Sequence, residues 1–259
     1  MMNYIQTERI NDIERLIQQQ SIIKISDLTK KFNVSSETIR RDLSELENRG
    51  VLRRVHGGAV KMNQLAEEAP FQSRQVIHLA EKGVIACAVA DLVSDGDSLI
   101  LDVGTTVQEV AKRLVEKSDL FVVTNSSVVA GILSPNKSHK IVLLGGELRA
   151  DELSTHGPIA IEQVRRFIAN KAILGAGGIT EEAITDFHFE QALLRREMIC
   201  RSKETVFAID SSKFGATALH QICKPSEINL IVTDRGVKDN EFGMNLSAFP
   251  PAGDRKSVV

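Results

Sequence analysis

Residues 34–60 read V-S-S-E-T-I-R-R-D-L-S-E-L-E-N-R-G-V-L-R-R-V-H-G-G-A-V, which predicts a helix followed by a short hairpin. Ser35 is a favourable N-cap, and apolar residues such as Ile39 and Leu43 then recur on one helical face. Gly50 is placed to end the helix, as glycine often does at the C′ position. Basic residues and a glycine pair follow. A capped helix with outward arginines and a basic hairpin is typical of a winged helix-turn-helix that enters a DNA groove.

The residues upstream supply the other helices of such a domain. Apolar residues at helical spacing predict a first helix over 8–19, and Ser26 is placed to cap a second helix over 27–32. Residues 33–35 then form the tight turn before the third helix. The first 62 residues are therefore predicted to fold as a DNA-binding domain of three helices and a wing.

The third helix and the hairpin carry the side chains expected to contact DNA. The candidates are Ser36, Glu37, Thr38, Arg40, Arg41 and Ser44 on the helix, and Arg53, Arg54 and His56 on the hairpin. An isolated Arg-Arg pair is more often a solvated helix surface, but its place in the third helix of this motif favours DNA contact. Glu37 either reads a base edge or complements the helix dipole, and His56 either contacts phosphate or shapes the turn.

This part of the chain, Met1 to Met62, resembles the N-terminal domain of the DeoR family of bacterial transcriptional regulators. The resemblance is carried by Glu8-Arg9, the run V-S-S-E-T-I-R-R-D-L, Leu46-Glu47, Gly50, and the pattern R-x-H-G-G-A from Arg54 to Ala59. It implies a winged helix that binds operator DNA as part of a homo-oligomer, a dimer or a tetramer.

The charge distribution agrees with a DNA-binding segment joined to a body that does not contact phosphate. Residues 1–61 carry 11 Lys and Arg against 8 Asp and Glu, a net charge of +3, whereas the remainder carries a net charge of −5. An excess of +3 is modest, so one copy is expected to bind DNA weakly and two or more copies to be needed.

Other classes of protein are disfavoured by composition. No apolar run has membrane length and no signal-peptide pattern is present, so a cytoplasmic location is expected. The chain has 3 cysteines, Cys87, Cys200 and Cys223, too few and too scattered for a disulfide framework or a zinc site. They are expected to be reduced and mostly buried, and no metal or cofactor is expected.

A second domain is predicted after a small, polar and acidic linker at residues 63–70, which ends in a proline. A helix over 76–92 opens this domain, which extends over residues 71–243. Short apolar runs then alternate with helical stretches. Six strands are predicted, at 98–102, 120–124, 140–144, 171–175, 205–209 and 228–233. This alternation predicts an α/β fold with an open, mostly parallel sheet covered on both faces. The polar segment 244–259 is expected to be a disordered tail outside the fold.

Nearly every predicted strand ends in small, hydroxyl or acidic residues, and open α/β sheets bind ligands at that edge. Gly104-Thr105-Thr106 opens a helix, where backbone amides, hydroxyls and the helix dipole favour an anion. Lys213 follows another strand and can add a positive charge. The alternative is a strand-to-helix turn in which the threonines only cap the helix. Asp102 either contacts a ligand or orients the threonine hydroxyls.

The second domain also resembles the DeoR family, in the segments D-V-G-T-T, V-V-T-N-S, L-L-G-G, G-A-G-G-I, D-S-S-K-F-G and I-V-T-D, so the resemblance covers roughly residues 1–243. It implies a sensor domain similar to ribose-5-phosphate isomerase and the coenzyme A transferases, which binds phosphorylated sugars or related metabolites. The effector residues that it implies are Asp102, Gly104, Thr105, Thr106, Thr124, Asn125, Gly145, Gly146, Gly177, Gly178, Asp210 and Lys213. The stretch 180–186 departs from the family pattern because it lacks a glycine.

Two functions fit these features. The first is a transcriptional repressor that a phosphorylated sugar releases from its operator. The second is a sugar-phosphate isomerase or coenzyme A transferase, which needs a placed acid–base pair or a nucleophilic carboxylate. Glu181 and Glu182 are the obvious loop carboxylates, but they look solvated. The loop at 186–188 either closes over a ligand or only buries its phenylalanine. The winged helix favours the repressor, with operator DNA and a small effector as partners.

Overall fold

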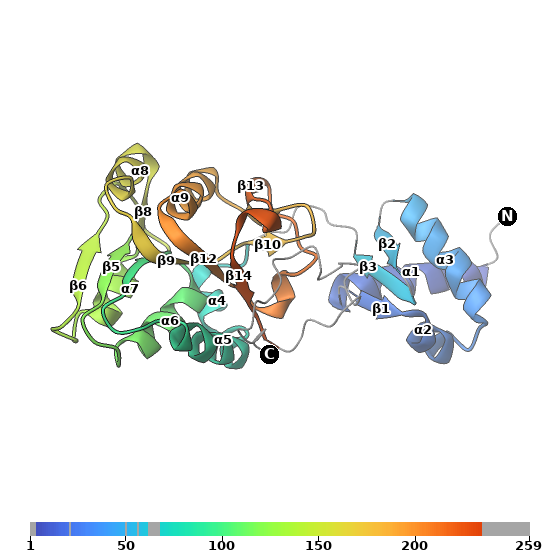
Figure 1. The fold of residues 1–259 in the computed structure, drawn as a ribbon. Helices are drawn as coiled ribbons and strands as arrows, with labels where there is room; N and C mark the ends of the chain where they lie inside the picture. The colour runs from blue at the N-terminus through green and yellow to red at the C-terminus, as the bar shows by residue number, and fades with distance from the viewer. Residues whose placement is uncertain (1–3, 21, 50, 56, 62–67, 235–259) are drawn as a thin grey trace. The chain divides into compact units, whose positions relative to one another are not determined.

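The computed structural model describes residues 4–20, 22–49, 51–55, 57–61 and 68–234 (Figure 1). The chain divides into two compact units, Met1–Gln64 and Leu65–Val259, here called the head and the body. Gly50, His56, residues 63–67 of the predicted linker and the predicted tail at 244–259 lie outside the described residues.

The head contains the three predicted helices and a small antiparallel sheet. The helices are α1 (Tyr4–Gln20), α2 (Ile25–Phe32) and α3 (Ser36–Asn48), and the strands are β1 (Ile22–Lys24), β2 (Leu52–Val55) and β3 (Gly58–Lys61), in the order β1-β3-β2. Their core consists of fully buried side chains that include Ile10, Ile13 and Ile17 of α1 and Ile39, Leu43 and Leu46 of α3. A Cβ on Gly58 would lie 2.2 Å from the carbonyl oxygen of Ile23, so only glycine lets β3 pair with β1 here.

One local prediction is wrong, and one short helix was not predicted. Ser26 does not cap α2, because the unpredicted strand β1 runs directly into this helix and leaves Lys24 at the N-cap. Ser26 instead lies in the first turn. The helix predicted over 76–92 is confirmed as α5 (Leu79–Asp91). A short helix that was not predicted, α4 (Phe71–Val76), precedes it, and His78, in a left-handed conformation with φ of 55°, separates the two.

The body is built on the predicted parallel sheet. Its strands are β4 (Ser98–Leu101), β5 (Phe121–Thr124), β6 (Lys140–Leu143), β9 (Ala169–Leu174), β12 (Ser202–Ala208) and β14 (Leu230–Val232), in the order β14-β12-β9-β4-β5-β6. All neighbouring pairs in this sheet are parallel. The chain therefore proceeds from β4 outward through β5 and β6, then returns to the other side of β4 for β9, β12 and β14. The reversal of strand order lies between β4 and β9.

Helices cover both faces of the sheet, as predicted (Figure 1). α5, α6 (Thr105–Leu114) and α7 (Ser127–Leu133) pack on the face that buries Leu99 and Leu101. α8 (Gly157–Val164) and α9 (Phe189–Cys200) pack on the face that buries Ile100. The opposite burial of adjacent residues of β4 follows from the two-residue period of a strand.

Shorter elements complete the body. They are an antiparallel sheet of β10 (Gly178–Ile179), β11 (Ile184–Asp186) and β13 (His220–Cys223), a pair of strands β7 (Glu147–Arg149) and β8 (Ser154–His156), and two 3-10 turns at Ser211–Lys213 and Pro225–Glu227. No helix in the described part of the chain is long and apolar enough to cross a membrane.

The cysteines differ from the prediction. Cys87 and Cys200 are exposed, whereas Cys223 is buried, so the expectation of mostly buried thiols is wrong. Burial raises the pKa of the Cys223 thiol to about 12, and this thiol is therefore inert at neutral pH.

Candidate functional site

The third helix of the head is fixed at its start and along its inner face. The Ser35 hydroxyl accepts the amide of Thr38 at 3.2 Å, which confirms the predicted N-cap. On the inner face, Asp42 is only 1% exposed and accepts Nε of Arg9 at 2.6 Å. This carboxylate raises the pKa of the Arg9 guanidinium. The buried ion pair ties α1 to α3, which accounts for the acidic residue inside the T-I-R-R-D-L run.

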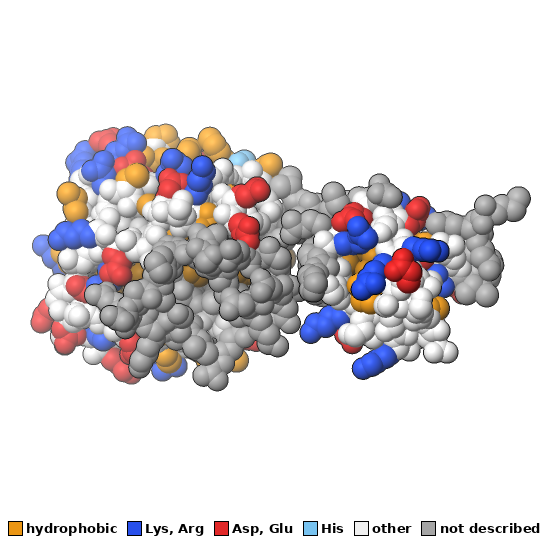
Figure 2. All heavy atoms as spheres, turned by 45° about the vertical axis from the view of Figure 1, so that its right-hand side comes forward, with side chains coloured by type: hydrophobic (Ala, Val, Ile, Leu, Met, Phe, Trp, Pro, Cys, Tyr) orange, Lys and Arg blue, Asp and Glu red, His pale blue; other side chains and the backbone are white. Residues whose placement is uncertain are grey.

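The outer face of α3 presents charge that is only loosely held. The side chains of Arg40 and Arg41 are 58% and 79% exposed, and their nitrogens lie 3.7 and 3.9 Å from the carboxylate oxygens of Glu37. These separations exceed hydrogen-bond distance. Ser36 is also exposed, and Thr38 is half-buried beside the cap. Lys and Arg side chains are spread over the visible face of the head in Figure 2.

The hairpin is fastened to the same helix. Arg54 donates Nε to Glu47 at 2.7 Å and Nη1 to the Ser44 hydroxyl at 2.6 Å. Two of the predicted DNA contacts, Ser44 and Arg54, thus bind each other in this structure. Arg53 pairs with Val60 in the hairpin, and His56 lies outside the described residues.

The body contains a cavity of about 140 Å³ where strand order reverses, at the carboxyl ends of β4, β9 and β12. This is where open α/β sheets bind ligands. Of the residues implied by the family resemblance, Gly104, Thr105, Thr106, Gly177, Asp210 and Lys213 line it. Thr105 and Thr106 are 7% and 9% exposed at the start of α6, and neither hydroxyl has a hydrogen-bond partner among the described residues. The first-turn amides of a helix also lack intrahelical acceptors.

Asp102 lies behind the lining of the cavity, and its carboxylate already accepts hydrogen bonds within the fold. It is 1% exposed and accepts Nε of Arg195 at 2.5 Å and the amide of Gly175 at 3.1 Å. Arg195 also donates to Asp186, the last residue of β11. Burial disfavours the charge of Arg195, but the two carboxylates outweigh it and raise the pKa of the guanidinium. Asp102 therefore orients Arg195 rather than the threonines.

The remaining residues implied for the effector do not line the cavity. They are Thr124, Asn125, Gly145, Gly146 and Gly178. The first four lie at the end of β5 or just after β5 and β6, on the opposite side of β4 from β9. The Thr124 hydroxyl accepts the amide of Ser126 at 3.1 Å, and the amide of Gly145 donates to Gln163 at 2.7 Å. These two hydrogen bonds therefore stabilise the turns after β5 and β6.

Several cavity residues carry no signal in the sequence. Lys82 of α5 is 4% exposed and donates to the carbonyl oxygens of Arg74 and Ile77. Burial lowers its pKa, although the charge of Asp210 opposes this. Glu68, Arg74, Glu152, Gln191 and Arg195 also line the cavity. A lone charged residue on a helix normally indicates solvent exposure, so only the fold brings these groups together.

The structure places some of the loop residues considered in the sequence analysis at the cavity and others away from it. Asp186 and Phe187 line the cavity, and His188 contacts one of its lining residues, Glu68. Glu181 and Glu182 are exposed and do not line it. Among the described residues, no group of His, Cys, Asp and Glu side chains is arranged to hold a metal ion.

Comparisons with known proteins agree for both units. The chain matches the DeoR-like helix-turn-helix domain over residues 9–64 and the DeoR C terminal sensor domain over residues 77–235. It is 35% identical over 233 residues to the transcriptional repressor AccR of Agrobacterium fabrum, covering 89% of this chain and 90% of AccR. It is 34% identical over 230 residues to the glycerol-3-phosphate regulon repressor of Escherichia coli, covering 88% and 91%. Ribose 5-phosphate isomerase A from Neisseria gonorrhoeae overlaps 52% of this chain and 53% of its own, with 16% identity and a TM-score of 0.39.

Proposed function

Because the chain belongs to the DeoR family of bacterial transcriptional regulators, we propose that it is a repressor released from its operator by a phosphorylated sugar or related metabolite bound in the cavity of the body. The observation that carries the proposal is the set of unpaired threonine hydroxyls at the start of α6, in a cavity also lined by Lys82 and Lys213. The chain is a DNA-binding regulator, and the alternative of an isomerase or transferase has no support.

The head supplies the operator contacts in this proposal. Arg40 and Arg41 project from α3 without a hydrogen-bonded partner, so they can contact base edges and phosphates at little cost. The surface of α3 that presents these arginines also contains or adjoins the other helix candidates, Ser36, Glu37, Thr38 and Ser44. The charge of the head is modest, and the proposal therefore includes a homo-oligomer, a dimer or tetramer that presents two or more heads. Such a regulator acts in the cytoplasm, on the nucleoid.

The effector is proposed to bind with its phosphate at the start of α6. The first-turn amides and the hydroxyls of Thr105 and Thr106 are donors, and the helix dipole favours an anion. Lys213 makes no ion pair with a described residue and adds charge. Lys82 has a third donor beyond the two that it gives to carbonyls. Asp186 and Asp210 can accept sugar hydroxyls. The E. coli relative is named for glycerol 3-phosphate, a small phosphorylated polyol.

Release requires only a small preference of the effector for the state that does not bind DNA. A coupling free energy of ~1–3 kcal/mol changes operator affinity about 5- to 150-fold. The same factor applies in reverse, so operator DNA should weaken effector binding equally. This reciprocity gives the proposal a quantitative check.

The test is operator release by full-length protein, titrated with sugar phosphates and their unphosphorylated parents. Thr105→Ala with Thr106→Ala removes two hydroxyl donors, and Lys213→Ala removes a charge. Each variant should bind operator normally but need at least about tenfold more effector for release, the behaviour of a super-repressor. Lys203→Ala, an exposed lysine of β12, is the matched control. Equal potency of phosphorylated and unphosphorylated compounds, or unchanged release by the variants, would contradict the phosphate site.

A further inference from the structure

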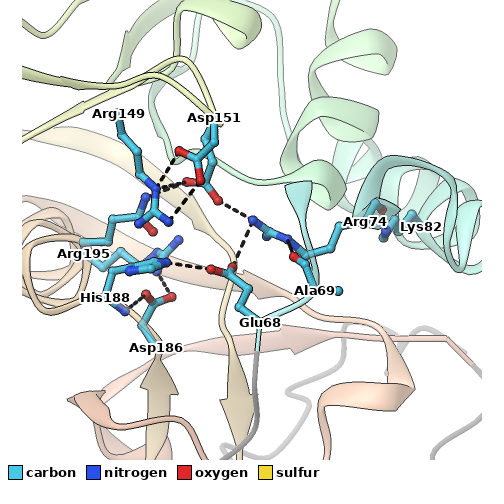
Figure 3. A network of polar contacts seen from close by, with 11 residues as sticks. Glu68, Ala69, Arg74, Lys82, Arg149, Asp151, Asp186, His188 and Arg195 are labelled. Carbon is cyan, nitrogen blue, oxygen red and sulfur yellow. Dashed lines mark hydrogen bonds and ion pairs between the residues drawn. The ribbon is translucent and has the colours of Figure 1, made fainter. Parts of the chain in front are cut away.

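The first described residue after the junction between head and body reaches into the cavity. Glu68 lies in an irregular segment that precedes α4, yet its carboxylate lines the cavity with Ala69 (Figure 3). One carboxylate oxygen lies 3.0 Å from Nη2 of Arg74, and the other lies 2.7 Å from Nε2 of His188. The two partners come from α4 and from the residue before α9. A carboxylate near the start of the body is thus held by two other groups of the body.

Arg74 is itself held in place by further contacts. Arg74 also donates to Glu152 and, through Nε, to the carbonyl of Ala69 at 3.0 Å. Glu152 is 2% exposed and accepts Nε2 of Gln191 at 2.6 Å. Figure 3 shows Arg74 pointing toward Glu68 from one side and His188 from the other. This preformed pair of donors suits any carboxylate or phosphate oxygen, not only that of Glu68.

The charges of the cavity indicate what must happen when an anion enters. Among the described lining residues, the cations are Arg74, Lys82, Arg195 and Lys213, and the anions are Glu68, Glu152, Asp186 and Asp210. These charges balance before any ligand binds. A phosphate monoester brings a charge of about −1.5 to −2 at neutral pH, so its entry leaves an excess of negative charge in a poorly solvated space. Loss of one resident carboxylate relieves this repulsion.

Glu68 is the carboxylate best placed to leave. Glu152, Asp186 and Asp210 are 2%, 3% and 4% exposed and lie in the folded interior. The side chain of Glu68 is 17% exposed, and its backbone belongs to no helix or strand. The cavity of about 140 Å³ is also smaller than the roughly 300–1,000 Å³ of typical ligand pockets. Withdrawal of Glu68 and Ala69 enlarges it.

We propose that Glu68 is a built-in competitor of the effector. Its carboxylate binds Arg74 and His188 in the effector-free protein, and an anionic effector displaces it, which releases the described residues from Glu68 to the start of α4. The inference rests on the proposed function, because it describes how effector binding in the same cavity changes the rest of the body. Effector binding and the Glu68 contacts exclude each other, so loss of these contacts should act in the same direction as effector.

The test uses full-length protein and inorganic phosphate as the probe. Glu68→Gln removes the competing charge, and Glu68→Ala also removes the hydrogen bonds. Both variants should bind phosphate about five- to tenfold more tightly than the unaltered protein, as expected for a coupling of ordinary size. Both should also bind operator more weakly without phosphate. Glu162→Gln, which removes an exposed partner of Arg166 on α8, is the matched control and should change neither affinity.

Hydrogen exchange separates failure of this inference from failure of the proposed function. Phosphate should protect amides of residues 104–108 and, at the same time, accelerate exchange in residues 71–77, where the Arg74 amide bonds to Pro70. If phosphate protects 104–108 but leaves exchange at 71–77 unchanged, and both Glu68 variants bind phosphate with unaltered affinity, then Glu68 is not a competitor. The proposed phosphate site is unaffected by that outcome. Absence of protection at 104–108 overturns both.

Discussion

The head and the body use arginine in opposite ways. Arg41 on α3 is 79% exposed, and its nearest acidic oxygen is 3.9 Å away. Arg195 on α9 is 6% exposed and donates to Asp102 and Asp186 at once. Both lie in candidate binding surfaces, and both belong to an Arg-Arg pair in the sequence. The difference is whether the guanidinium is already committed to partners within the fold.

This difference distinguishes an arginine that is available to bind a partner molecule from one that stabilises the fold. An exposed guanidinium keeps its donors for a partner and loses little when it binds one. A buried guanidinium between two carboxylates compensates charges that would otherwise be unpaired, and its removal leaves them so. Arg195 lines the cavity of the body, but its main contribution is expected to be structural. The following experiments test this contrast.

The largest expected effect is on the stability of the body. Arg195→Ala leaves Asp102 and Asp186 buried without a counter-charge, which should cost about 3–5 kcal/mol of unfolding free energy. Urea unfolding followed by circular dichroism measures it. Arg166→Ala, which removes an exposed pair with Glu162, should cost no more than about 1 kcal/mol. Similar losses in the two variants would show that burial does not distinguish these arginines.

The next effect is on operator binding. Arg41→Ala should lower operator affinity by about 1–3 kcal/mol if the guanidinium reads a base, and should relax specificity at one position. Its unfolding free energy should stay within about 0.5 kcal/mol of the unaltered protein, since the side chain is exposed. Fluorescence anisotropy with operator variants measures the first effect. Arg15→Ala, an exposed arginine of α1, is the control. An affinity unchanged by Arg41→Ala contradicts the predicted docking.

Local signals explain what could be predicted from the sequence. Both architectures were predicted from local features, namely the helical and strand periods, the Ser35 cap and the apolar strands. Each of these depends on residues that are near one another in the chain. The same logic failed at Ser26, because a local capping preference was overridden by the pairing of β1 with β3. The apolar pattern did predict α5, but it did not predict the short helix α4, which the left-handed residue His78 separates from α5.

The composition of the cavity could not be predicted in the same way, because it depends on strand order. Every parallel strand ends at the same edge, but only β4, β9 and β12 meet around the cavity. Thr124 and Gly145 resemble Thr105 and Gly177 in the sequence, yet they lie beyond β4 on the other side. Arg195 lies 93 residues from its partner Asp102. No local pattern encodes such a separation.

The smallest expected effect concerns Arg54, which is intermediate between the two classes. It is 46% exposed like an arginine available to DNA, yet it donates to Glu47 at 2.7 Å and to Ser44 at 2.6 Å. Arg54→Ala should therefore lower the unfolding free energy of the head by about 0.2–1 kcal/mol, the range of exposed ion pairs. It should weaken operator binding less than Arg41→Ala, because binding to DNA requires Arg54 to give up partners that Arg41 does not have. A double-mutant cycle with Glu47→Gln isolates the pair, and its coupling energy should account for most of the stability loss. An operator effect larger than that of Arg41→Ala, with no coupling to Glu47, would show that Arg54 belongs with the freely presented arginines.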